Sequence, residues 1–218
     1  RRTDEGGIEL DEDRERLAKW LTGTTLGSAL DRAFAAVSAR RVLPSMRSLQ
    51  FGGEAILRHH ARLVNCSFSP VARLEFFREY LFLLLAGTGC GFSVQHHHVA
   101  RLPALPVRGE EMELVVRHHT IGDTIEGWAD ALHLLLVSHY EGFKVEFNFS
   151  QVRPRGSALR TSGGKAPGHL PLKQSLLDIE TVLTAASGRK LRPIEVYDIC
   201  MFAARSVLSG GIRRSATI

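Results

Sequence analysis

A stretch rich in both cations and glycine is the part of this 218-residue sequence that most directly suggests chemistry. Residues 153–168, RPRGSALRTSGGKAPG, contain Arg153, Arg155, Arg160 and Lys165 among four glycines. Glycines let a backbone approach an anion closely, and guanidinium groups and backbone N–H groups hold phosphate oxygens. The stretch lacks the GxxxxGK[ST] order of a Walker A loop. It predicts a site for a phosphate or a nucleotide, with a solvated basic loop as the alternative.

Cysteines and histidines are the other residues that could carry chemistry. The three cysteines, Cys66, Cys90 and Cys200, are far apart and form no CxxC pair, which argues against a closed zinc site and a disulfide framework. The histidine run at 95–99, QHHHV, is predicted to lie on a strand, where successive side chains point to opposite faces. The three imidazoles would then not converge on one ion, and we predict no metal site.

Composition excludes few classes of protein. There are 28 Lys and Arg against 23 Asp and Glu, a net charge of +5, and 44% of the residues are hydrophobic. This mild basic excess is weaker than in most nucleic-acid-binding domains, so we expect no polymeric nucleic acid as partner. The longest apolar run, at 80–87, is too short to cross a bilayer. With the reducing environment that the cysteines favour, we expect a cytoplasmic protein with no membrane partner.

Helical and strand-like segments alternate along the chain. Apolar spacing and end signals predict helices at 13–21, 26–40, 74–89, 123–142, 171–188 and 192–211, and strands within 61–71, 90–102, 144–152 and 212–218, with a loop or strand-loop segment at 40–56. This order is typical of an α/β fold with largely parallel strands, whose ligands gather beyond the strand C-termini. The basic stretch at 153–168 leaves one such strand, and a second cationic glycine segment, SGGIRRSATI at 209–218, enters another.

Several phrases, taken in order, resemble the adenosylcobalamin-dependent (class II) ribonucleotide reductases. They are NCSF (65–68), LLLAGTGCGFSVQHHHVARLP (83–103), DTIEGWADALHLLL (123–136), VEFNFSQVRPRGSALRTSGGKAPG (145–168), GRKLRPIEVYDI (188–199) and VLSGGIRRSATI (207–218). The resemblance implies the first half of a ten-stranded α/β barrel at 41–218, after a short helical segment at 1–40. It also implies the conversion of ribonucleotides to 2′-deoxyribonucleotides by cysteine thiyl radical chemistry.

The resemblance implies roles for particular residues. Cys66 matches one cysteine of the reducing pair, whereas Cys90 and Cys200 are expected to be structural. The implied substrate-binding residues are Asn65, Ser45, Arg47 and Ser48. The implied loops for an allosteric nucleotide contain Arg155, Arg160 and Lys165, and a specificity segment contains Ser209, Gly210, Gly211 and Arg213.

The implied cofactor is adenosylcobalamin, although no ligand for it can be named in this sequence. The implied partners are a ribonucleotide substrate, a deoxynucleotide effector, a thioredoxin-like reductant and the missing C-terminal half of the barrel. The radical cysteine is expected beyond Ile218, so the chain alone should be inactive. Diphosphate or triphosphate as substrate, and cobalamin or another radical source, stay open. Two other hypotheses are a non-catalytic nucleotide-binding regulatory module and a basic α/β domain that binds RNA.

Overall fold

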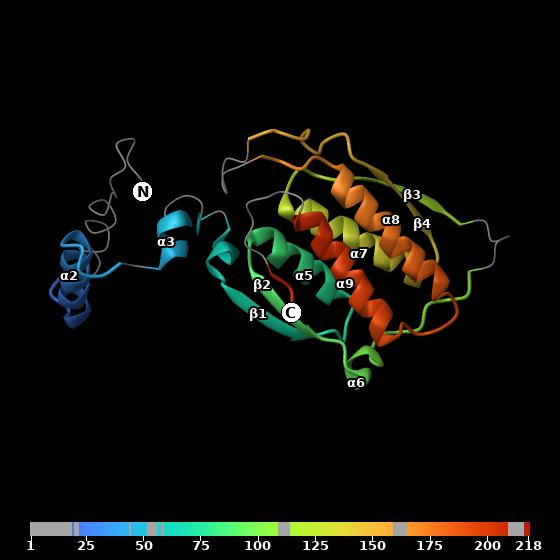
Figure 1. Cartoon of the computed structure of the whole chain (residues 1–218), viewed down its shortest axis with the longest axis horizontal. Helices are drawn as coiled ribbons and strands as arrows, with labels where there is room; N and C mark the ends of the chain where they lie inside the picture. Colours follow the sequence, from blue (N-terminus) through green and yellow to red (C-terminus); the bar gives the residue numbers. More distant parts are fainter. Residues whose placement is uncertain are drawn as a thin grey trace. The chain divides into compact units, whose positions relative to one another are not determined.

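A computed structural model describes residues 19, 22–43, 45–51, 56–57, 59–108, 114–158, 165–208 and 216–218 (Figure 1). The chain forms two compact units, residues 1–63 and residues 64–218. The division predicted at residue 40 stays a prediction.

The first unit is helical where it is described. Helix α2, Thr25–Ser38, begins at Thr24, whose hydroxyl accepts a hydrogen bond from the Gly27 backbone N–H at 3.0 Å. Helix α3, Met46–Phe51, and the 3-10 helix η1, His60–Leu63, follow it. The loop or strand-loop expected at 40–56 was therefore wrong at α3, where no proline or glycine interrupts six consecutive residues.

The second unit begins with a parallel strand–helix–strand motif. Strand β1, Cys66–Pro70, leads into helix α5, Glu75–Ala86, and then strand β2, Gly89–Ser93. β1 and β2 are parallel, with Cys66 opposite Gly89. Gly87 ends α5 in the left-handed conformation, with φ 94°, and turns the chain from the helix into β2.

A second parallel motif follows. Strand β3, Val116–Thr120, helix α7, Ile125–Glu141, and strand β4, Lys144–Asn148, repeat the same order, with β3 parallel to β4. Sequence patterning had missed β3, because its segment VRHHT lacks the apolar alternation of a half-buried strand. Hydrogen bonds to β4 define this strand rather than burial of its side chains.

Helices form the core of the second unit. Helix α8, Leu170–Ala185, packs against helix α9, Pro193–Leu208, while α5 packs against α7. Figure 1 shows these four helices together, with α5 next to β2 and α7 next to β4. Side chains from all four are almost fully buried, among them Phe77, Leu81, Leu132, Leu136, Ile179, Leu183 and Ile199. Burial of such apolar surface is the main force that stabilises the unit.

The prediction of an α/β fold with parallel strands is confirmed. A five-stranded half-barrel is not seen: the named strands of the described residues form two separate parallel pairs. Residues 216–218 add to one pair, since Thr217 forms a parallel bridge with Cys90 on β2. No helix among the residues described is both long and apolar enough to cross a membrane.

Candidate functional site

Cys66 is the first residue of β1, and its side chain is exposed. The Gly89 N–H donates to the Asn65 carbonyl at 2.9 Å, and the Thr88 hydroxyl donates to the Val64 carbonyl at 3.1 Å. These two bonds fix the backbone that enters β1 on either side of the exposed Asn65 side chain. The sequence-predicted pair of Asn65 and Cys66 therefore lies at one end of a parallel sheet, with both side chains accessible.

The other two cysteines are buried. Cys90 is 2% exposed, and its sulfur lies 3.4 Å from the Ser67 hydroxyl, which donates to it. Burial raises the pKa of the Cys90 thiol, and burial raises the pKa of Cys200 far above its usual range. Because thiolates rather than thiols exchange with disulfides, neither buried cysteine is suited to redox chemistry at neutral pH. Of the three cysteines, only Cys66 is placed to react.

The cationic glycine stretch forms the base of a hairpin. The Gly156 N–H donates to the Ala166 carbonyl at 2.9 Å, and the Ala166 N–H donates to the Ser157 carbonyl at 2.8 Å. Ala158 and Lys165 form an antiparallel bridge just above these bonds. The described part of the stretch is therefore paired rather than an open loop, and residues 159–164 lie outside the described residues.

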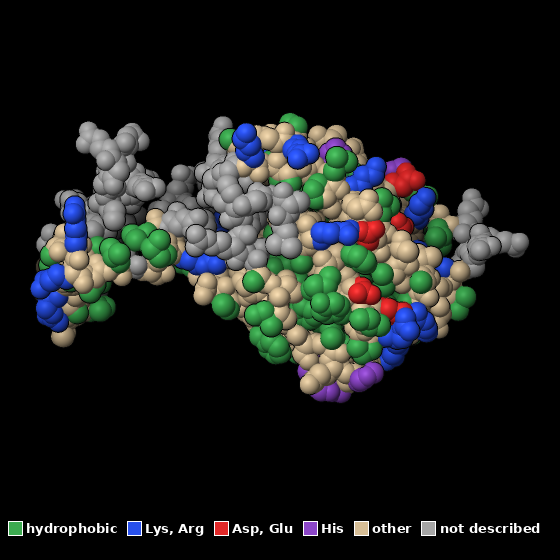
Figure 2. All heavy atoms as spheres, viewed as in Figure 1, with side chains coloured by type: hydrophobic (Ala, Val, Ile, Leu, Met, Phe, Trp, Pro, Cys, Tyr) green, Lys and Arg blue, Asp and Glu red, His purple; other side chains and the backbone are tan. Residues whose placement is uncertain are grey.

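The hairpin carries its described cations on the outside. Arg155 and Lys165 are both exposed. Figure 2 shows Lys and Arg side chains along the edge of the molecule where this segment runs in Figure 1. Gly168 has φ +77°, and a Cβ atom there would lie 3.0 Å from the Arg155 backbone nitrogen. Glycine at this position lets the returning strand pass close to Arg155 and into α8.

An ion pair fixes the root of the hairpin to the residues just before α7. Arg153 Nε donates to Asp123 Oδ2 at 2.6 Å, and the Arg153 N–H donates to Asp123 Oδ1 at 3.3 Å. The Thr124 hydroxyl accepts from the Gly127 N–H at 2.9 Å and so caps α7. A Cβ atom on Gly127 would meet the Gly122 carbonyl oxygen at 2.6 Å. These contacts make residues 122–128, GDTIEGW, a closely packed start to α7.

The residues implied to contact substrate fall in two units. Ser45, Arg47 and Ser48 lie in the first unit, at and within α3. The Arg47 guanidinium donates to the Arg62 carbonyl at 2.9 Å. Asn65 and Cys66 belong to the second unit. Arg160, Ser209, Gly210, Gly211 and Arg213 lie outside the described residues.

The run of histidines departs from its predicted structure. β2 ends at Ser93, and residues His96–Val99 form a short helix, α6, rather than a strand. The side chains of these three histidines therefore do not alternate between two faces of a sheet, as was expected for a strand. Among the residues that are described, no group of three or more His, Cys, Asp or Glu side chains could hold a metal ion. His98 Nδ1 instead lies 3.1 Å from the Ser93 hydroxyl.

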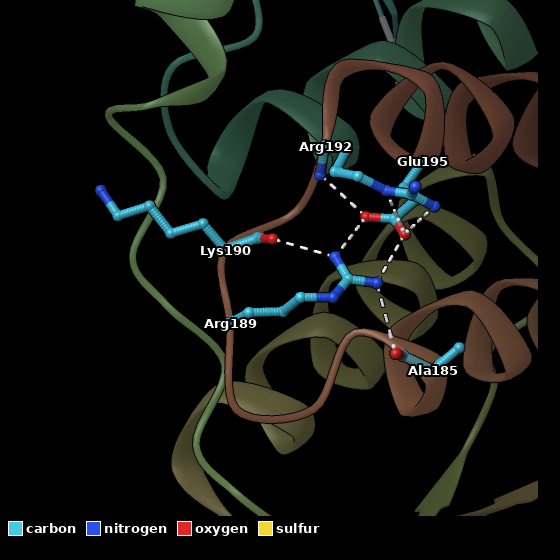
Figure 3. A network of polar contacts seen from close by, with 5 residues as sticks. All are labelled: Ala185, Arg189, Lys190, Arg192 and Glu195. Carbon is cyan, nitrogen blue, oxygen red and sulfur yellow. Dashed lines mark hydrogen bonds and ion pairs between the residues drawn. The ribbon is translucent and has the colours of Figure 1, made fainter.

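A buried carboxylate joins α8 to α9 (Figure 3). Arg189 donates to both oxygens of Glu195, at 2.8 Å and 2.7 Å, and Arg192 donates to Oε1 from its side chain and to Oε2 from its backbone. These bonds, with Arg189 first, lower the pKa of Glu195 from 4.5 to about 2. Arg189 also donates to the Ala185 carbonyl near the end of α8. The network therefore joins the end of α8 to the first turn of α9.

Comparisons with known proteins give one consistent picture. A family model described as B12-dependent ribonucleotide reductase, insertion domain, matches residues 108–183. The adenosylcobalamin-dependent ribonucleoside-triphosphate reductase of Euglena gracilis is 31% identical over 194 residues, which are 85% of this chain and 26% of the relative. The reductase of the same name from Lactobacillus gasseri is 24% identical across 100% of this chain and 37% of the relative. The chain thus spans between about a quarter and about two fifths of these relatives.

A solved structure matches the fold. The crystal structure of a B-12 dependent (class II) ribonucleotide reductase superposes with a TM-score of 0.76 at 22% sequence identity, over 88% of this chain and 34% of that one. The segment matched by the insertion-domain model includes β3, α7, β4 and the described base of the hairpin. The motifs quoted from the sequence did not predict a match to an insertion domain.

Proposed function

We propose that this chain, a relative of the adenosylcobalamin-dependent (class II) ribonucleotide reductases, supplies one reducing thiol and an effector-binding hairpin to such an enzyme. The observation that carries the proposal is the placement of Cys66. It is the exposed cysteine of the three, and it begins the first strand of a parallel βαβ motif. The β1–α5–β2 motif, with residues 216–218 added parallel to β2, would form part of the first half of the barrel.

The chemistry asked of Cys66 is a two-electron reduction. In the proposed reaction, the 2′-hydroxyl of a ribonucleotide leaves as water and hydrogen replaces it. Cys66 and a second cysteine of the complete enzyme provide two electrons and two protons and become a disulfide. An external dithiol of the thioredoxin type then reduces that disulfide. An exposed thiol at a strand end can meet both substrate and a partner thiol, which a buried one cannot.

The proposed cofactor of the complete enzyme is adenosylcobalamin, the group that the relatives are named for. When bound, it would supply the radical that starts the reaction. The part of the chain that is described offers isolated buried atoms, such as His139 Nε2 and Tyr140 Oη on α7, rather than a cradle for a corrin ring. These residues do not fit the cofactor, so we assign none of them to it.

The hairpin is the proposed site for the phosphates of an allosteric deoxynucleotide. Arg155 and Lys165 are exposed at its base, and Arg160 belongs to its tip in sequence. The ion pair of Arg153 with Asp123 fixes the root of the hairpin, and this restricts where the exposed cations Arg155 and Lys165 can lie. The specificity segment with Ser209, Gly210, Gly211 and Arg213 is proposed to carry the effector signal towards the substrate, with Asn65, Ser45, Arg47 and Ser48 at the substrate itself.

The reducing role is tested with Cys66→Ser in the full-length protein that contains this sequence. We expect loss of multiple turnovers with adenosylcobalamin, a ribonucleotide and a dithiol, while deoxynucleotide binding is kept. Cys200→Ala is the matched control, because that thiol is fully buried on α9. Its replacement should cost some stability but should leave turnover unchanged. Full turnover by Cys66→Ser would refute the assignment. Nucleotide binding without turnover in the unmodified protein would favour a regulatory module.

The effector role is tested by removing one charge at a time. Arg155→Ala, Arg160→Ala and Lys165→Ala should each weaken deoxynucleotide binding by about tenfold or more, the effect of losing a hydrogen bond to a charged group. Basal turnover without effector should be kept. Lys144→Ala removes the same charge at the opposite end of β4 and serves as control. Equal loss of basal turnover in the hairpin variants would move these residues to the substrate site. Tighter and steeply salt-dependent binding of RNA would favour the RNA-binding hypothesis.

A further inference from the structure

The hydroxyl of Tyr80 joins two segments that are far apart in sequence. Tyr80 lies on α5 and is 2% exposed. Its oxygen is 3.3 Å from the Cys200 carbonyl on α9 and 2.8 Å from the Thr217 hydroxyl. Because α9 ends at Leu208, these two contacts hold the chain on both sides of residues 209–215.

The direction of each hydrogen bond follows from the groups present. A carbonyl oxygen can only accept, so the Tyr80 hydroxyl donates to Cys200. The Tyr80 oxygen is then left to accept from the Thr217 hydroxyl. Burial raises the pKa of Tyr80 above its usual value, so the hydroxyl keeps its proton at any working pH. The bond to Cys200 is buried and the bond to Thr217 is partly buried, so leaving the Tyr80 hydroxyl without these partners is costly.

The strand held by Tyr80 is in turn bound to β2. The Cys90 N–H donates to the Ala216 carbonyl at 2.7 Å, and the Ile218 N–H donates to the Cys90 carbonyl at 3.1 Å. On its other edge β2 pairs with β1, the strand that begins at Cys66. Tyr80 therefore helps to fix residues 216–218, which pair with one edge of β2, while β1, which begins at Cys66, pairs with the other edge.

We infer that Tyr80 is a positioning residue for effector-dependent substrate selection, acting by holding Thr217 and α9 at a fixed separation. This inference rests on the proposed function. Two sites are coupled only if a structural element responds to both. In this inference residues 216–218 are that element, because they follow the proposed specificity segment in sequence and pair with β2, which pairs with the strand that begins at Cys66. Tyr80 need touch neither nucleotide to affect this coupling.

The test uses Tyr80→Phe in the full-length protein. The ring should keep its packing, since it stacks on Phe76 at 5.6 Å and meets Phe92 edge-on at 5.6 Å. Tyr140→Phe is the matched control, because the Tyr140 hydroxyl is buried and has no hydrogen-bond partner among the described residues. Thr217→Val removes the other half of the same hydrogen bond with little change of shape.

The readout is the ratio of kcat/KM for a purine ribonucleotide to that for a pyrimidine ribonucleotide, with and without a deoxynucleotide effector. We expect the effector-induced change in this ratio to fall about fivefold in Tyr80→Phe and in Thr217→Val, as for loss of one ordinary hydrogen bond. In the double variant, the effector-induced change in this ratio should be within about twofold of its value in either single variant. Turnover without effector should stay within about twofold of the unmodified enzyme.

Either of two results would overturn the inference. One is an unchanged effector response in Tyr80→Phe. The other is a loss of turnover without effector equal to the loss of effector response, which would indicate a structural role alone. An unmodified protein with no reductase turnover would instead contradict the proposed function, so the two failures can be told apart. Hydrogen exchange of the Ile218 amide, faster in Tyr80→Phe than in Tyr140→Phe, would show that the intended contact was broken.

Discussion

Replacement of Glu195 by glutamine should open the junction between α8 and α9. The side chain of Glu195 is 9% exposed and accepts hydrogen bonds from both Arg189 and Arg192. The fall of its pKa from 4.5 to about 2 corresponds to about 3 kcal/mol of stability. The side chains of Arg189 and Arg192 are 41% and 67% exposed, so solvent screening reduces this figure, and we expect a loss of about 2 kcal/mol at pH 7.

The sign of the pH dependence follows from the lowered pKa. The folded pKa of Glu195 lies below the unfolded value, so the stabilisation is fully present above about pH 5 and is lost as the pH falls from 4.5 towards 2. The difference in unfolding free energy between the unmodified protein and Glu195→Gln should therefore shrink over that range. Urea unfolding at pH 7 and at pH 3 measures it, and hydrogen exchange of residues 186–196 locates it.

Glu141→Gln provides the matched control, because Glu141 is exposed at the end of α7. This variant should differ from the unmodified protein by no more than about 0.5 kcal/mol. A Glu195→Gln variant as stable as the control at pH 7 would refute the reasoning. So would a difference that stays constant down to pH 2, since that would reflect side-chain packing rather than charge.

Three further predictions concern α7. Burial lowers the pKa of His139 to about 4, so the free energy of unfolding should fall by about 2 kcal/mol between pH 7 and pH 5, as the imidazole takes up a proton in the unfolded state. In urea unfolding, His139→Gln should reduce this dependence of stability on pH. An unchanged pH dependence in that variant would contradict the prediction. Gly127→Ala should cost about 1–3 kcal/mol in thermal unfolding, because its Cβ would overlap the Gly122 carbonyl; a neutral result would mean that the helix start can shift freely. Thr124→Ala should cost about 1 kcal/mol through loss of the cap, and Thr124→Ser should recover most of it.

Sequence reasoning was accurate where helices are long and carry end signals. Helices α5, α7, α8 and α9 are predicted by the sequence because apolar spacing and end signals act locally. β3 was missed because its pairing with β4 is a tertiary contact that its exposed residues do not encode. α6 was mistaken for strand because a polar run of histidines has no decisive periodicity.

The candidate site was predictable in kind but not in geometry. Arg155 and Lys165 could be singled out from their neighbours in sequence, but their support by a paired hairpin depends on backbone bonds between residues 156–158 and 165–166. The exposure of Cys66 could not be foreseen either, because Cys66 and Cys90 both lie in short strands. The difference follows from the register of the sheet: Ser67, not Cys66, lies opposite Cys90, so Cys66 and Cys90 point to opposite faces.

The contrast between one exposed and two buried cysteines also makes this part of the protein suitable for spectroscopy. Within these 218 residues, a nitroxide or fluorescent maleimide should attach at Cys66 and spare Cys90 and Cys200, with no cysteine removed beforehand. A label there would sit at the end of β1, beside Asn65 and two strands away from residues 216–218. Its mobility could then report directly on whether a nucleotide bound elsewhere changes the environment of the thiol.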